Sequence, residues 1–222
     1  MPAPRQQRGT GVCAGGNPLR SLVVGAALLC SLCMALAHST GELLFHEDFT
    51  QEDPAWEPAE GLTVGSGRAE LKPRKGTHDW TLYGGLAFTD ADISVDIIVP
   101  PHREETIGGL IFWAQSNNSW FALRISTAHG GYAQVLRLQG DSFLNRVSWR
   151  KVPALRTSAG STNQLRVTLK GKSASALING APFVNFKGAS PTGGRIGLYA
   201  SSGDHAANAW QFTNLSVRRP SP

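Results

Sequence analysis

Cysteine is confined to the first 33 residues of this 222-residue chain, at Cys13, Cys30 and Cys33. The rest of the chain therefore has no disulfide, no thiolate nucleophile and no cysteine-based metal site. A domain without disulfides must hold its fold by core packing. The six tryptophans and nine phenylalanines can supply that core, or an exposed stacking surface.

Acidic residues are scarce in the second half of the chain. Only Asp141 and Asp204 follow Thr106, against thirteen lysines and arginines, whereas seven of the sixteen acids lie between Glu42 and Glu60. This asymmetry indicates either a solvated basic exterior or attraction to an anionic partner, such as an acidic glycan or a membrane head group. No nucleic-acid-binding motif is present, so we expect no nucleic-acid partner.

Long hydrophobic runs are absent except for Ser21–Leu36, which follows a basic stretch without acids. The run is shorter than the ~20 apolar residues that a membrane span needs. With Ala35-Leu36-Ala37 as a small-x-small cleavage site, it predicts a secretory signal peptide over residues 1–37; the alternative is a transmembrane anchor. We expect a single mature domain over residues 38–222, secreted or periplasmic, with no stable membrane span after cleavage.

Helical periodicity is also missing, and period-2 alternation of apolar and polar residues takes its place. Leu165–Lys170 alternates throughout, and Asn179-Gly180 is a strong hairpin turn signal. Ala91–Val99 alternates and stops at Pro100-Pro101. We expect about twelve short antiparallel strands in a sandwich or barrel. The predicted strands include Leu43–Phe49, Arg68–Leu71, Trp80–Tyr83, Gly108–Gln115, Trp120–Ser126, Tyr132–Gln139, Arg146–Lys151, Ser173–Ile178 and Trp210–Val217.

Several of these segments resemble the 3-keto-disaccharide hydrolase domain family, which belongs to the concanavalin A-like lectin/glucanase superfamily. The resemblance covers nearly all of residues 38–222 and rests on strand cores and turn glycines. It implies an all-β fold, a two-sheet antiparallel jelly-roll sandwich whose concave face often holds a glycan. The matching segments are Leu44–Phe49, Gly108–Phe112, Trp120–Arg124, Leu165–Val167, Ile178–Gly180, Gly194–Leu198 and Phe212–Val217.

The sequence offers only scattered candidates for a catalytic site. The Glu-x-Asp-x-x-Glu motif of laminarinase-like glucanases is absent, although hydrolysis needs two carboxylates close together. Asp92 and Asp96 share one face of a strand, and we interpret them as solvent-facing acids. We expect that the protein requires no cofactor. Binding of calcium or another divalent metal is an open alternative. The family resemblance implies these metal-ligand candidates: His78-Asp79, His102 with Glu104-Glu105, His129 and Asp204-His205.

The alternating strands also predict a binding surface. On Trp120–Ser126, one face carries Phe121, Leu123 and Ile125, which we assign to the core, while Trp120, Arg124 and Ser126 share the other. Arginine forks beside tryptophan rings suit a sugar, including one with a carboxylate, phosphate or sulfate; the alternative is that the tryptophans only pack. The predicted ligand-binding residues are Trp80, Trp113, Gln115, Trp120, Arg124, Ser126, Trp149 and Arg150.

Together these features predict an exported, non-catalytic carbohydrate-binding protein that acts on an envelope or environmental glycan. One alternative is a glycoside hydrolase of the 3-keto-disaccharide type, which requires histidines and carboxylates to converge in a groove. The other is a protein-interaction or adhesion module, which requires a flat apolar or basic patch instead.

Overall fold

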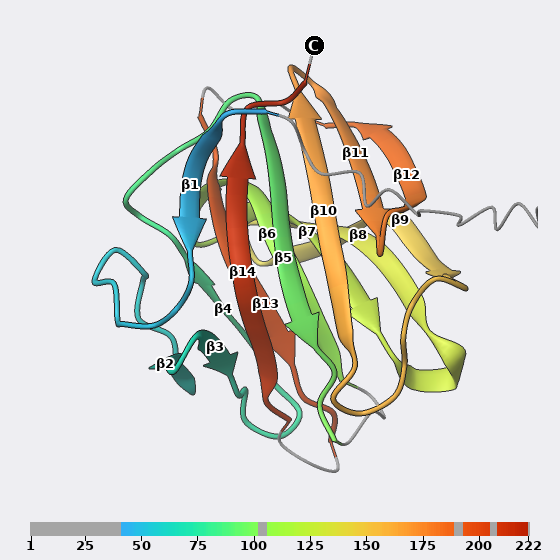
Figure 1. Cartoon of the computed structure of the whole chain (residues 1–222). Helices are drawn as coiled ribbons and strands as arrows, with labels where there is room; N and C mark the ends of the chain where they lie inside the picture. Colours follow the sequence, from blue (N-terminus) through green and yellow to red (C-terminus); the bar gives the residue numbers. More distant parts are fainter. Residues whose placement is uncertain (1–40, 102–105, 189–192, 205–207, 222) are drawn as a thin grey trace, which may run out of the picture. The chain divides into compact units, whose positions relative to one another are not determined.

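The computed structural model describes residues 41–101, 106–188, 193–204 and 208–221 (Figure 1). All of them belong to one compact unit, Leu36–Pro222. The predicted signal peptide lies outside the described residues. Within the described ranges, no helix has the length and apolarity needed to cross a membrane.

The described residues form two antiparallel sheets, as the alternation predicted (Figure 1). The larger sheet has the order β12-β11-β10-β5-β14-β3-β2, and β1 pairs with β14. Its strands are β1 (Leu43–Glu47), β2 (Leu62–Gly65), β3 (Arg68–Leu71), β5 (Ala91–Ile98), β10 (Thr162–Lys170), β11 (Ser173–Ile178), β12 (Ala181–Lys187) and β14 (Trp210–Arg218).

The second sheet has six strands in the order β4-β13-β6-β7-β8-β9. Strands far apart in the chain lie side by side in it, since β13 sits between β4 and β6. This arrangement of two sheets is a jelly-roll sandwich. The strands are β4 (His78–Leu82), β6 (Ile107–Ser116), β7 (Ser119–Ser126), β8 (Tyr132–Gln139), β9 (Ser142–Lys151) and β13 (Arg195–Ser201).

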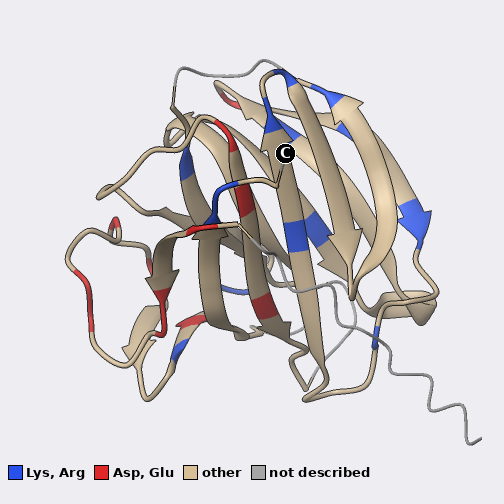
Figure 2. Ribbon diagram, turned by 45° about the horizontal axis from the view of Figure 1, so that its top comes forward, with Lys and Arg blue, Asp and Glu red and all other residues tan. Residues whose placement is uncertain are grey.

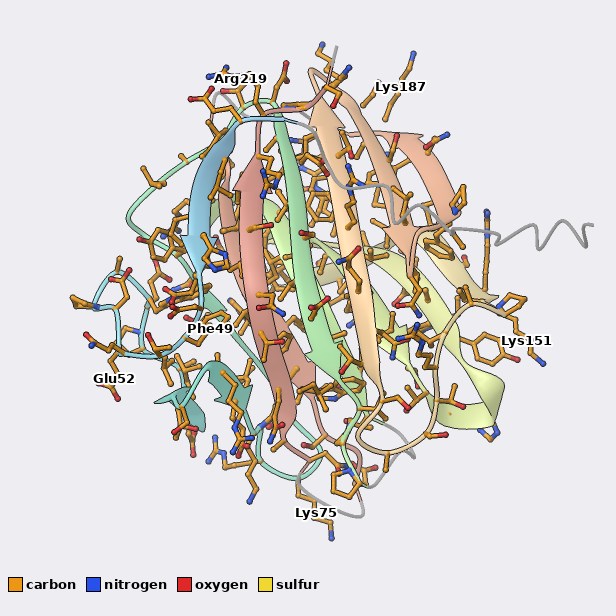
Figure 3. The ribbon with its side chains drawn as sticks, viewed as in Figure 1. Phe49, Glu52, Lys75, Lys151, Lys187 and Arg219 are labelled. Carbon is orange, nitrogen blue, oxygen red and sulfur yellow. The ribbon has the colours of Figure 1, made fainter. Side chains whose placement is uncertain are left out.

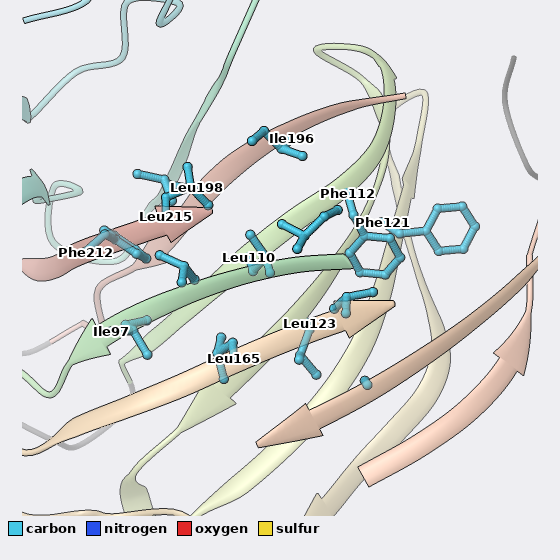
Figure 4. Packing of buried hydrophobic residues seen from close by; sticks show 14 of the residues in the cluster. Ile97, Leu110, Phe112, Phe121, Leu123, Leu165, Ile196, Leu198, Phe212 and Leu215 are labelled. Atoms are coloured by element: carbon cyan, nitrogen blue, oxygen red, sulfur yellow. The ribbon is translucent and has the colours of Figure 1, made fainter. Parts of the chain in front are cut away.

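The main core fills the space between the sheets (Figure 4). Each strand contributes its apolar alternate positions, because successive side chains leave a strand on opposite faces. Burial of each large aliphatic or aromatic side chain contributes roughly 1.5–3 kcal/mol. Core residues labelled in Figure 4 are Ile97, Leu110, Phe112, Phe121, Leu123, Leu165, Ile196, Leu198, Phe212 and Leu215.

The alternation breaks at Trp113 in β6. Trp113 has φ 52°, in the left-handed region, and the pairing of β6 with β7 is irregular between Phe112 and Ser116. Such a bulge adds a residue to one strand and shifts the facing of those that follow. Phe112 and Trp113 therefore both join the core between the sheets, and Trp113 is 2% exposed. Trp113, which we predicted as a ligand-binding residue on the sheet surface, therefore lies between the sheets instead.

Charge follows the asymmetry of the sequence. Figure 2 shows acidic residues on the long loop after β1 and on β5, and basic residues on β10 and beyond it. In Figure 3, Lys151, Lys187 and Arg219 lie at the periphery of the sandwich. The basic second half of the chain thus presents its charges mainly along sheet edges and strand ends.

Candidate functional site

The outer face of the six-stranded sheet carries a second hydrophobic cluster, separate from the main core. An outer sheet face that meets water is normally polar. Here its residues are buried although the described residues form no further sheet over them. The buried members are Leu82, Ile111, Ala114, Trp120, Ala122, Leu136, Leu138 and Tyr199, with Trp80 and Ile107 partly buried against them.

The cover comes from the two edge strands of the sheet. The rings of His78 on β4 and Phe143 on β9 lie 4.8 Å apart between centroids. Since β4 and β9 are the first and sixth strands, a flat sheet would separate them by about 24 Å. The sheet must therefore twist and curl until its edges converge, which makes this face concave. We call His78, Trp80, Trp120 and Phe143 the aromatic bridge.

Trp120 lies at the packed centre of the aromatic bridge. Trp120 lies 5.3 Å from Trp80, 5.9 Å from Tyr199 and 6.2 Å from Phe143 between ring centroids. The indole nitrogens of Trp80 and Trp120 both donate to the carbonyl of Asn117, at 3.1 Å each. Trp120 is consequently 1% exposed, so its ring is not available to stack on a ligand.

Arg124 occupies the middle of the concave face and is 9% exposed. It donates from Nη1 to the Tyr199 hydroxyl at 2.8 Å and from Nη2 to Gln134 Oε1, while its Nε finds no acceptor among the described residues. Its guanidinium carbon lies 5.0 Å from the Tyr199 ring centroid and 5.6 Å from that of Trp149. Arg124 thus holds Tyr199, Gln134 and Trp149 in place by hydrogen bonds and cation–π contacts.

Burial governs protonation in this region. Burial lowers the pKa of Arg124 and raises the pKa of Tyr199. Burial, followed by the positive charge of Arg124, lowers the pKa of His78. The His78 imidazole therefore packs against Phe143 in its neutral form at pH 7.

A cavity of about 400 Å³ opens on the concave face beside Trp149, within the range of small-ligand sites. Ser126 and Tyr132 lie opposite each other on β7 and β8 and both contribute to it. The turn η1 (Ala128–Gly130) joins these strands and presents His129 with φ 51°. Trp149 is 37% exposed, so part of its ring is free. The full lining is Ile107, Ser126, Ala128, His129, Tyr132 and Trp149.

The predicted site residues divide in this structure. Trp80, Trp120, Arg124, Ser126 and Trp149 share the concave face, and among them only Ser126 and Trp149 line the cavity. A part in ligand binding stays a prediction for these residues, although burial excludes stacking of a sugar on the Trp120 ring.

Two other predicted residues lie away from the cavity. Gln115 follows the bulge of β6, is exposed, and donates from Nε2 to the carbonyl of Gly193 at 3.2 Å. Arg150 lies opposite Ala133, whose side chain belongs to the main core. Arg150 therefore leaves β9 on the opposite side from Trp149.

Carboxylates are almost missing from this sheet. Its six strands, all described, contain one acid, Asp79, which lies opposite Ala200 of the main core and so projects away from the concave face. Burial, followed by the charge of Glu60, raises the pKa of Asp79. The concave strands therefore supply no pair of carboxylates for glycoside hydrolysis.

The other predicted acids lie on the eight-stranded sheet. Asp92 and Asp96 share a face there, but Asp92 is buried, accepting a 2.7 Å hydrogen bond from Nε of Arg166. Our interpretation of Asp92 as solvent-facing was wrong, because β10 places Arg166 over it. Asp96 accepts from Nδ2 of Asn214 at 2.9 Å.

The structure describes only some of the metal-ligand candidates. His102, Glu104, Glu105 and His205 lie outside the described residues. Among the residues that the structure does describe, no group of three or more His, Cys, Asp or Glu side chains is placed to hold a metal ion.

Comparison with known proteins supports the fold. No family model matches the chain, and no curated protein matches it. The carbohydrate-binding module CBM66 from Bacillus subtilis superposes with a TM-score of 0.55 and 12% identity, over 68% of this chain and 86% of that one. The β-glucanase of Bacillus licheniformis superposes with a TM-score of 0.58 and 12% identity, over 82% of this chain and 100% of that one.

The carbohydrate recognition domain of Emp46p, in its potassium-bound form, gives a TM-score of 0.60 and 14% identity, over 79% of this chain and 96% of that one. Identities this low show the fold alone. The chain therefore has a concanavalin A-like jelly-roll fold, of a kind found in glycan-binding domains and glucanases.

Proposed function

We propose that this protein binds carbohydrate without hydrolysing it, and that a sugar ring occupies the cavity beside Trp149. The observation that carries the proposal is the partly exposed Trp149 ring on the wall of a preformed, largely apolar cavity. The C–H face of a sugar packs on such a ring, as apolar groups do on aromatic faces generally.

The polar groups around the cavity suit sugar hydroxyls. Ser126, His129 and Tyr132 are among its lining residues, and their side chains can donate or accept hydrogen bonds. A few placed polar groups within apolar walls are typical of small-ligand sites. The carbohydrate-binding names of two structural neighbours, a binding module and a recognition domain, further support a glycan ligand.

We extend the proposal to anionic sugars. Arg124 is committed to Tyr199 and Gln134, so it is not the expected anion ligand. Lys151 lies near Gly130, with its Nζ 3.8 Å from where a Cβ of Gly130 would stand. That position brings a cation close to η1 and His129, where a carboxylate or sulfate of a bound sugar would be attracted.

Glycoside hydrolysis of the 3-keto-disaccharide type is the second candidate. It rests on the resemblance of strand cores and on a glucanase among the structural neighbours. The single, inward-projecting acid of the six-stranded sheet favours binding over hydrolysis. A protein-interaction role is the third candidate, and the exposed Phe143 and Leu144 on edge strand β9 favour it.

We further propose that the protein is exported, with cleavage after Ala37 and a secreted or periplasmic location. The basic region, short apolar run and small-x-small site at residues 1–37 support this.

A glycan array probed with residues 38–222 tests the binding proposal, with each hit then assayed for turnover. Trp149→Ala should abolish or strongly reduce every hit that the unmodified protein gives. Leu144→Ala is the matched control, because Leu144 is 43% exposed on the same strand but lies outside the cavity. Equal loss in both variants, or turnover of the hits, would overturn the proposal.

A further inference from the structure

We infer that the cavity receives the end of a glycan chain, or a short saccharide, and excludes an internal segment of a long chain. This inference rests on the proposed function and specifies which part of a glycan the site recognises.

The first observation is the burial of the concave face beyond the cavity. A chain that ran through the site along the curled sheet would need exposed groups on both sides of the bound ring. Beyond Trp149, however, the facing residues of the central strands are almost inaccessible. Arg124, Gln134, Leu136, Leu138, Trp120 and Tyr199 are all buried.

The second observation is what buries them. His78 and Phe143 come from opposite edges of the sheet and touch above the concave face. Trp80 and Trp120 fill the space beneath, and the shared Asn117 carbonyl fixes both indoles. The aromatic bridge therefore closes this part of the concave face by direct side-chain contact.

The third observation is the size of the remaining space. At about 400 Å³ the cavity lies near the lower end of the ~300–1,000 Å³ typical of ligand sites. It is bounded towards the centre of the sheet by Trp149, whose ring packs over Arg124. Because the neighbouring face is buried, we expect a sugar on Trp149 to extend away from the bridge, with one end of the glycan in the cavity.

Chain-end recognition predicts how binding capacity depends on cleavage. The probes are lichenan, xyloglucan, levan and polygalacturonate, each used intact and after limited endo-hydrolysis to a measured number of chain ends. Moles of protein bound per gram of polymer are measured by isothermal titration calorimetry. We expect capacity to rise by the same factor as the number of ends; capacity that follows polymer mass alone would overturn the inference.

Opening the aromatic bridge should relax this selectivity. Phe143 is 40% exposed, so Phe143→Ala removes the bridge contact with modest effect on the main core. We expect this variant to gain capacity on the intact polymers, and His78→Ala to do the same from the other edge. Leu144→Ala is the matched control and should keep the capacity of the unmodified protein.

Each outcome has a defined meaning. Binding that follows polymer mass, unchanged by Phe143→Ala and His78→Ala, leaves the proposed function standing and overturns chain-end recognition. Failure of the unmodified protein to bind any of the four polymers or their fragments overturns both.

Discussion

Replacing Trp120 with alanine tests whether the concave face is a second core. Trp120 is buried and packs against Trp80, Phe143 and Tyr199. Truncation of a buried tryptophan to alanine costs about 3–5 kcal/mol. The Asn117 carbonyl keeps its bond from Trp80, so the substitution leaves no unpaired acceptor there. Because the exposed Phe143 ring can partly fill the gap, we expect the lower end, about 3 kcal/mol.

The assay is urea unfolding of the domain, monitored by far-ultraviolet circular dichroism. The unmodified protein and the variant are fitted with the same dependence of unfolding free energy on urea concentration. Trp149→Ala is the control, because Trp149 is only partly buried, and we expect it to cost no more than about 1.5 kcal/mol. A loss below about 1 kcal/mol for Trp120→Ala, within the range of ordinary surface changes, would refute the second core.

Three further predictions concern charge and processing. Asp92→Ala leaves Arg166 without its carboxylate and should cost about 3 kcal/mol in urea unfolding; an unchanged midpoint would contradict the buried pair. The lowered pKa of His78 means that the unfolded chain binds a proton more readily, so stability should fall as pH drops below about 6.5 and level off below the folded pKa. His78→Gln should flatten that part of the stability profile, and a profile identical to that of the unmodified protein would refute the role of His78. N-terminal sequencing of exported protein should begin near His38, and a retained N-terminus would contradict cleavage.

Local alternation was sufficient to predict the two sheets. It failed at Trp113, where a bulge with a left-handed residue reverses the facing, and nothing in the apolar sequence around Phe112 marks that reversal. It also missed β12, because Pro182 argues against a strand interior, although an edge strand tolerates proline.

The candidate site was predictable only in part. The alternation of side chains along β7 placed Arg124 and Ser126 on one face. Pairing β7 with β8 across the turn would have added Tyr132, which lies opposite Ser126. The contact of His78 with Phe143 joins residues 65 positions apart in the chain, on opposite sheet edges. It depends on how far the whole sheet curls, which no local pattern encodes. The burial of Trp120 follows from that curl.

The most direct test of the account is a crystal structure of the domain with an oligosaccharide identified on the glycan array. We predict a sugar ring packed on the exposed part of the Trp149 indole, with hydroxyls bonded to Tyr132 or Ser126 and no sugar over the aromatic bridge. A sugar bound on the eight-stranded sheet, or one that passes between His78 and Phe143, would contradict it.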